Sequence, residues 1–365
     1  MKTFHALLLL LALPFSLAAN MANPVTEGTL GALPFVSEYA TIQECMITIT
    51  PRPGCRQAHF RVRYLINVER DGQDIPLLFY AVDYTDEFSV KLDEQVVPTQ
   101  IVPERYRRLE GTDFSAFAKS FSASGWDSTQ TVAIAYDAGQ TYYAPLTDFH
   151  YFEADLSAGS HVITVEYLAD IWLDRSDWVK KWSFRYALKP AEQWKETVYI
   201  DVTLVTNECA LAWTTNLGQP SHQARHLQQW MITPEERTDV LLINYRPPVS
   251  RLARVLLWFR PRGLATAISI LLAFFHLSVL WARRRTASTR WLRLWIIGGA
   301  VLVPALTILV YMLGFSWIDA ALGEAASQYH GYYFFAIVYY PLVAFTYGLL
   351  SWGLLRFLSL TDFSN

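Results

Sequence analysis

Three long apolar runs close this 365-residue chain, and they constrain its fold more than any other feature. They cover residues 264–281, 294–317 and 331–358. Each is long enough to cross the hydrocarbon core of a bilayer, which takes about 20 residues in a helix. Backbone groups find no water to bond in that core, so each run is predicted to be a transmembrane helix.

The first 19 residues have the layout of a secretion signal. Lys2 supplies a positive charge, an apolar run from Leu7 to Leu13 follows, and small residues lead up to Ala19. This order is typical of a cleaved signal peptide, and the apolar run is too short to span a bilayer. We therefore predict that the following domain is exported. An uncleaved anchor is the alternative, and it leads to the same export.

Charges beside the apolar runs predict their orientation. Loop 282–293 contains five arginines and no acid, whereas loop 318–330 contains two acids and neither lysine nor arginine. The positive-inside rule places the first loop in the cytoplasm and the second loop outside. The tail 359–365 is then cytoplasmic. We expect an integral protein of a bacterial inner membrane, with its β domain in the periplasm or extracellular space.

A basic cluster on the outer flank of the first run does not follow this rule. It consists of Arg251, Arg254, Arg260 and Arg262. A large translocated domain can override such charges, but the side chains still need partners. Lipid phosphates and the acidic surface of the exported body are the two candidates.

Residues 41–250 are patterned as strands. From Phe60 to Val68, large apolar residues occupy every second position, which is typical of a half-buried strand. Many short strands separated by turn residues predict an antiparallel β-sandwich, immunoglobulin-like or jelly-roll-like. Segment 20–40 is predicted to be extended. One short helix is predicted near residues 112–123.

The exported body is acidic. Ten of the 30 Lys and Arg residues and three of the 33 Asp and Glu residues lie from Arg251 onward, which leaves 20 bases and 30 acids before it. Such a balance argues against a nucleic-acid partner. It leaves the lipid bilayer and an envelope protein or glycan as the expected partners. No cofactor is predicted.

Four tryptophans, with charged residues between them, lie between Asp170 and Trp194. The candidate ligand-binding side chains are Trp172, Trp178, Trp182 and Tyr186. On a strand, Trp182 and Tyr186 share one face, so the simplest interpretation is the buried face of the sandwich. The alternative is an aromatic platform for a sugar ring or peptide, with Trp172 and Trp178 exposed on a loop.

Histidines offer two candidate sites. His276 lies well inside the first apolar run, where an ionisable residue is a functional candidate by default. The alternative is a purely structural role, in which a neutral His276 imidazole is hydrogen-bonded to a neighbouring helix. His222 and His226 are four residues apart, as a metal pair on a helix would be, but their segment reads as a loop. No further ligand stands at a suitable spacing, so no metal site is predicted.

The chain contains Cys45, Cys55 and Cys209. In an oxidising compartment one pair is plausible, and one cysteine is left over. Cys45–Cys55 is the nearest pair and a possible disulfide. If Pro51–Gly54 forms a tight turn, however, that bridge requires an irregular loop, so the pairing stays open.

No stretch carries a strong catalytic or nucleotide-binding motif. The leading hypothesis is a non-catalytic, membrane-anchored envelope protein whose outward sandwich binds a protein or glycan partner. The alternative is an envelope enzyme or transporter subunit with its site at the outer membrane face. That site would use the arginine cluster and His276.

Overall fold

The computed structural model describes most of the chain. The described residues are 24–36, 40–69, 71–85, 88–104, 121–123, 130–194, 198–209, 211–236, 238–331 and 333–361. They form two compact units. The β unit holds Val25–Asp174 and Lys181–Arg246, and the helical unit holds Arg175–Lys180 with the chain from Pro247 onward. The predicted signal peptide lies outside the described residues.

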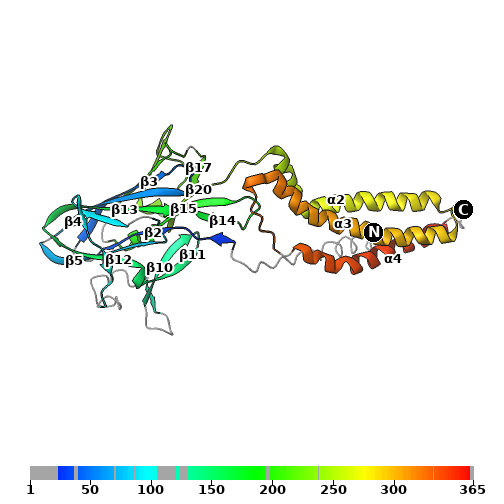
Figure 1. Ribbon diagram of the computed structural model, residues 1–365, viewed down its shortest axis with the longest axis horizontal. Coiled ribbons are helices and arrows are strands. Elements are labelled where there is room, and N and C mark those ends of the chain that lie inside the picture. Colours follow the sequence, from blue (N-terminus) through cyan, green and yellow to red (C-terminus); the bar gives the residue numbers. More distant parts are fainter. Residues whose placement is uncertain are drawn as a thin grey trace. The chain divides into compact units, whose positions relative to one another are not determined.

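Two large sheets build the β unit (Figure 1). The nine-stranded sheet has the order β1 (Val25–Thr26), β14 (Trp172–Asp174), β15 (Lys181–Ala187), β2 (Leu30–Val36), β5 (Gly72–Val82), β12 (Phe149–Leu156) and β8 (Gln100–Ile101). Off this path, β20 (Val240–Tyr245) pairs with β15 and with β17 (Trp213–Thr215). The eight-stranded sheet has the order β18 (His222–Ala224), β19 (Leu227–Ile232), β16 (Ile200–Val205), β3 (Ala40–Pro51), β4 (Gln57–Val68), β13 (Gly159–Asp170), β6 (Ser89–Leu92) and β7 (Gln95–Val97).

The main core lies between these two sheets. Strand β4 buries every second residue from Phe60 to Val68, as its apolar alternation predicts. The ring of Phe60 stacks on Tyr167 of β13 at 5.4 Å and meets Phe184 of β15 edge-on at 6.2 Å. Side chains from both sheets therefore interdigitate, and the predicted β-sandwich is confirmed.

A second core lies on the other face of the nine-stranded sheet. A three-stranded sheet covers that face, in the order β11 (Gln140–Pro145), β10 (Gln130–Asp137) and β9 (Phe121–Ala123). Val132 of β10 is buried together with Tyr80 of β5, Phe149 of β12 and Trp172 of β14. The nine-stranded sheet is thus covered on both faces, by the eight-stranded sheet and by the three-stranded sheet.

The structure departs from the predicted antiparallel sandwich in its strand directions. Strand β2 runs parallel to β15, and β3 runs parallel to β16, so the sheets are mixed. Strand β2 also falls in segment 20–40, which showed no strand pattern. Leu33 faces the main core while Leu30 and Phe35 face the second, so both faces are apolar and no alternation remains.

The helix predicted at 112–123 is not supported where it can be examined. Residues 112–120 lie outside the described residues, and Phe121–Ala123 forms strand β9. Its pairing with β10 accounts for the extended backbone, because a strand partner overrides a local helical preference.

The helical unit contains α2 (Arg251–Arg283), α3 (Thr289–Leu322), two 3₁₀ turns, η7 (Gly323–Ala325) and η8 (Tyr333–Tyr339), and α4 (Tyr340–Thr361) (Figure 1). Three stretches in this unit are long and apolar enough to cross a membrane. The helices extend beyond the predicted runs, and α3 continues into the predicted outer loop. Ser250 and Ser288 cap α2 and α3, because their side chains accept hydrogen bonds from Ala253 N and Trp291 N.

Two prolines shape these helices. Arg260, just before Pro261, has φ 54° and ψ 171°, so α2 consists of two helical pieces joined by a kink. The third run begins as the 3₁₀ turn η8 and becomes an α-helix at Tyr340, next to Pro341. A proline is tolerated in the first turn of a helix, where its missing N–H has no intrahelical partner.

Candidate functional site

A concave pocket of about 390 Å³ lies on the β unit. It forms where the end of β5, the short edge strand β8 and the 3₁₀ turn η4 (Leu146–Asp148) before β12 meet. Its wall consists of Ala81, Val82, Asp83, Tyr84, Thr99, Gln100, Ile101, Thr147, Asp148, Phe149 and His150. Carboxylate, amide, hydroxyl and aromatic groups thus converge on one hollow.

The hollow follows from a change of sheet. Strand β5 ends at Val82 in the nine-stranded sheet, and the next strand, β6, belongs to the eight-stranded sheet. Tyr84 already bridges to Ala169 of β13. At the departure point Asp83 has φ 56°, and its carbonyl accepts a hydrogen bond from Thr29 Oγ1 at 2.5 Å. The departing chain and the edge strand β8, which pairs with β12, border the hollow.

Two acids give the pocket its electrostatic character. Asp148 is half-buried, and this burial raises the pKa of its carboxyl, with a further increase from the nearby Asp83. The Thr147 hydroxyl, which donates to Asp148 Oδ1 at 3.4 Å, partly opposes the increase. The described wall contains no lysine or arginine, so its fixed charge is negative.

His150 closes one side of the pocket. Its ring stacks on Phe88 at 3.9 Å between centroids. Burial lowers the pKa of the imidazole, although a hydrogen bond with the Ala81 backbone acts the other way. The ring is therefore neutral at neutral pH and does not offset the two carboxylates.

Tyr80 lies behind this acidic region in the second core. Only 2 % of the residue is exposed, and its hydroxyl has no hydrogen-bond partner among the described residues. Burial raises the phenol pKa, and the charges of Asp148 and Asp83 add to the increase. A buried hydroxyl without a partner costs stability, so this position is held by the packing of its ring.

The aromatic platform considered from sequence does not form. Trp172, Trp182 and Tyr186 are 5 %, 8 % and 2 % exposed, so they are parts of cores, as the simpler interpretation predicted. Trp172 packs beneath the buried guanidinium of Arg185, whose carbon lies 4.3 Å from the ring centroid. Asp137 pairs with Arg185 at 3.3 Å. The shared face of Trp182 and Tyr186 is buried as predicted, but the opposite face of β15 is buried as well, because Ser183 and Arg185 are 1 % and 3 % exposed.

Trp178 belongs to the helical unit rather than to an exposed loop of the β unit. Its ring stacks on Phe315 at 5.5 Å and lies 4.6 Å from the ring of His330. The neighbouring Val179 forms a β-bridge with Ala326. Trp178 is therefore a packing residue of the helical unit. Phe315 and His330 are far from Trp178 in the sequence, so the local sequence pattern could not predict this role.

The predicted basic cluster lies around the kink of α2. Arg251 and Arg254 precede the kink, Arg260 occupies it, and Arg262 follows it. All four residues are exposed. The sequence located the cluster, and the structure adds the change of direction in its middle.

His276 links all three long helices. Its Nε2 lies 3.1 Å from the Trp295 carbonyl of α3, and its Nδ1 lies 2.8 Å from the Tyr347 hydroxyl of α4. A carbonyl oxygen can only accept, so Nε2 carries the hydrogen, and a neutral ring accepts at Nδ1. In return Trp295 Nε1 donates to the His276 carbonyl at 3.4 Å. The interpretation of His276 as an imidazole bonded to neighbouring helices agrees with this geometry.

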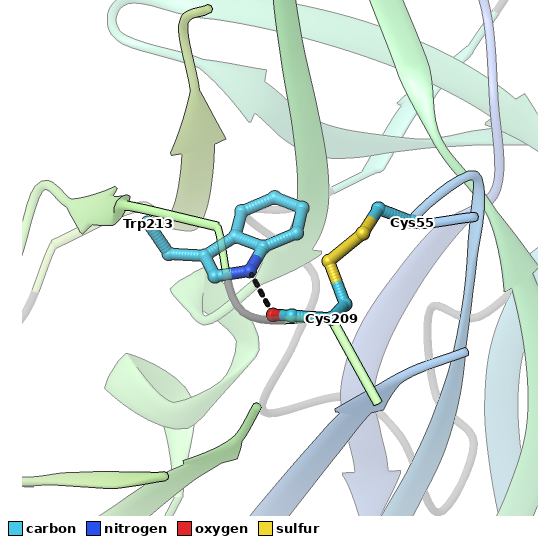
Figure 2. Close-up of a disulfide and its surroundings, with 3 residues drawn as sticks. All are labelled: Cys55, Cys209 and Trp213. Carbon is cyan, nitrogen blue, oxygen red and sulfur yellow. Dashed lines mark hydrogen bonds between the residues drawn. A yellow bond between two sulfur atoms is a disulfide. The ribbon is translucent and has the colours of Figure 1, made fainter. Parts of the chain in front are cut away.

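Cys55 pairs with Cys209, not with Cys45 (Figure 2). The bridge joins the β3–β4 turn to the loop after β16, across 154 residues, and the Cα atoms are 5.7 Å apart. Trp213 Nε1 donates to the Cys209 carbonyl at 3.4 Å and fixes that loop (Figure 2). Cys45 on β3 is buried in the main core and forms no disulfide. The nearest-neighbour pairing was therefore wrong.

The histidines considered as a metal pair do not share a helix. His222 starts the exposed strand β18, and His226 lies in the turn before β19. Within the described ranges, no group of three or more His, Cys, Asp or Glu residues is arranged to hold a metal ion.

Sequence reasoning missed the pocket residues. In the sequence, Asp83 directly follows the apolar run Leu77–Val82, and Asp148 comes two residues after Thr141–Leu146, and both segments have a composition typical of strands. Acids just past strand ends were thus a visible signal. Their meeting in space depends on strand order, which the local pattern does not contain.

Comparison with known proteins gives no family assignment. No family model matches the chain, and no curated protein matches it. Among solved structures, a candidate nutrient-binding protein from Legionella pneumophila is similar over 88 % of this chain and 100 % of its own, with 12 % identity and a TM-score of 0.40.

Zinc metallopeptidases are also among the similar structures. An M1 zinc metallopeptidase from Deinococcus radiodurans is similar over 59 % of this chain, with 10 % identity and a TM-score of 0.25. Yeast LTA4 hydrolase with bestatin has 6 % identity over 58 % of this chain and a TM-score of 0.31. This chain spans only 40 % and 29 % of their lengths. Likeness at this level carries no functional argument.

Proposed function

We propose that this protein is a membrane-anchored envelope component whose β unit binds a protein or glycan partner outside the membrane, without converting it chemically. The pocket at the end of β5 carries the proposal. Its volume of about 390 Å³ is typical of ligand-binding clefts, which occupy roughly 300–1,000 Å³. Asp148 and Gln100 can hydrogen-bond a sugar or peptide, and Tyr84 offers a flat ring.

Two further observations support the proposed location. Five arginines lie in loop 282–293 between the first two apolar runs, which favours a cytoplasmic loop and an exported β unit. The Cys55–Cys209 disulfide fits an oxidising compartment such as the bacterial periplasm.

Photo-crosslinking at the pocket rim tests the binding role. Ile101 is 74 % exposed at the pocket, and Tyr199 is 55 % exposed elsewhere on the β unit, so it serves as a matched control. A benzophenone amino acid at position 101 should give discrete adducts in cells, and the Asp148→Lys substitution should abolish them. Equal labelling from positions 101 and 199, or no adduct from either, would contradict the proposal.

Protease treatment of sealed spheroplasts tests the proposed orientation. Added protease should degrade the β unit and spare the loop with five arginines. An intact β unit in sealed spheroplasts, with degradation only after lysis, would place it in the cytoplasm.

A further inference from the structure

The first piece of α2 combines positive charge with exposed apolar side chains. We name residues 251–259, which precede the kink, the flank helix. Leu252, Val255 and Trp258 are 64 %, 54 % and 79 % exposed. Arg251 and Arg254 are exposed on the same short helix. This composition is unusual for a surface in water, because three large apolar residues lie uncovered within two turns.

The opposite side of the flank helix is held in place by packing. Ala253 is fully buried with Ile318 and Leu322 of α3, and Leu256 and Leu257 pack against the same cluster. The exposed apolar side chains are therefore presented by a fixed helix. They do not result from a loose end of chain.

The kink fixes where the flank helix lies relative to the apolar stretch of α2. Arg260 has a positive φ of 54°, a conformation that is strained for a non-glycine residue and that the surrounding packing must hold. The following Pro261 is buried against α3, and a Cβ on Gly314 would lie 3.1 Å from its Cα. The apolar run starts at Leu264, so the flank helix lies at the boundary of the predicted membrane-crossing stretch.

We propose that the flank helix lies in the membrane interface and binds anionic phospholipid headgroups. Arg251, Arg254 and Arg260 contact the phosphates, for which the planar guanidinium forms paired hydrogen bonds. Leu252, Val255 and Trp258 insert at the level of the headgroups and upper acyl chains, where amphipathic helices and Trp side chains prefer to lie.

The exposed apolar side chains decide between the two partners considered for these arginines. An acidic protein surface could neutralise the guanidinium groups, but it offers no medium for Leu252, Val255 and Trp258. A lipid interface supplies both the negative charge and the apolar layer. The proposal therefore also accounts for the arginines that break the positive-inside pattern, and it is independent of the pocket on the β unit.

Lipid selectivity of the full-length protein tests this proposal. The protein is reconstituted in an equal mixture of phosphatidylcholine and phosphatidylglycerol, and its preference for spin-labelled forms of the two lipids is measured. The wild type should prefer phosphatidylglycerol. The double variant R251Q/R254Q should lose that preference, by about fivefold for each arginine removed. The matched variant R52Q/R225Q removes two exposed arginines of the β unit and should keep it.

A fluorescent label tests the insertion separately. Cys45 is buried and the other two cysteines form a disulfide, so a thiol introduced by Val255→Cys can be labelled selectively. An environment-sensitive dye there should emit as in an apolar medium and be quenched by spin-labelled lipids, whereas the same dye at Arg225→Cys should report water. A water-exposed label at position 255 would overturn the proposal, as would equal lipid selectivity of wild type and R251Q/R254Q.

Discussion

The β unit and the helical unit place their large apolar side chains in opposite ways. In the β unit Phe60, Tyr64 and Phe79 are no more than 2 % exposed. In the helical unit Leu271 and Phe274 are 63 % and 72 % exposed. The positions that are buried among the helices include small residues such as Ala265, which is 2 % exposed.

This difference is consistent with two solvents acting on one chain, water on the β unit and lipid on the helical unit. Water drives the large side chains of the β unit inward. A lipid medium supplies no such force between helices, so their association depends on the close approach of small residues and on interhelical hydrogen bonds. Gly299 and His276 illustrate this dependence, because a Cβ on Gly299 would lie 2.1 Å from His276 Nε2.

Truncation of one aromatic residue in each unit should give the largest difference in stability between the two units. Phe60→Ala leaves a cavity in the main core and should lower the free energy of unfolding of the β unit by about 3–5 kcal/mol. Phe274→Ala removes a ring that faces outward from α2 and should change the stability of the detergent-solubilised protein little. Denaturant titrations followed by near-UV circular dichroism measure both. Equal losses would refute the comparison.

Removal of the disulfide should affect the β unit alone. Joint replacement of Cys55 and Cys209 by serine releases a link across 154 residues and should cost about 2–5 kcal/mol. The helical unit contains neither cysteine, so the thermal stability of its helices should stay unchanged. The same titration, with far-UV circular dichroism for the helices, distinguishes the outcomes. A matching loss in both units would mean that they unfold together.

Two adjacent glycines of α3 test close packing in the helical unit. Gly299→Ala should displace the His276 ring and destabilise the helix packing by about 1–3 kcal/mol. A Cβ at position 298 would have no atom within 4 Å, so Gly298→Ala serves as the control. It should raise stability slightly, because alanine forms helices better than glycine. Unfolding in mixed micelles measures both variants. If Gly298→Ala is as damaging as Gly299→Ala, contact with His276 is not the cause.

A surface pair of the β unit should give the smallest effect. The hydrogen bond with Asp93, 2.7 Å from Nδ1, raises the pKa of His161. A raised pKa stabilises the fold fully below the ordinary value near 6.5, and this contribution is lost as pH rises through the higher folded value. The stability difference between wild type and His161→Gln should therefore be below about 1 kcal/mol and should shrink from pH 5.5 to pH 8.5. A difference that grows with pH would contradict the assignment.

Sequence patterns predicted well wherever one local property decides the structure. The alternation from Phe60 to Val68 predicted β4, because one face of that strand is buried. The pattern failed for Leu30–Val36, where both faces are buried and no alternation remains. The pattern likewise gave no sign that Arg185 is buried, because its cover is the Trp172 ring on another strand.

The candidate site was less predictable than the fold. Asp83 and Asp148 stand just after segments with the composition of strands, but 65 positions separate them in the sequence. They meet because β5 and β12 are neighbours and because the chain leaves the nine-stranded sheet after Val82. Neither feature has a signal in local hydropathy.

The sequence by itself determined that a β-rich body precedes three apolar helices, because hydrophobic period and run length are local properties. Only the tertiary structure decided that Cys55 bonds to Cys209, that β2 pairs with β15, and that His276 fits against Gly299. These contacts join residues far apart in the chain. They form through the simultaneous packing of many elements, which the order of residues along any one segment does not specify.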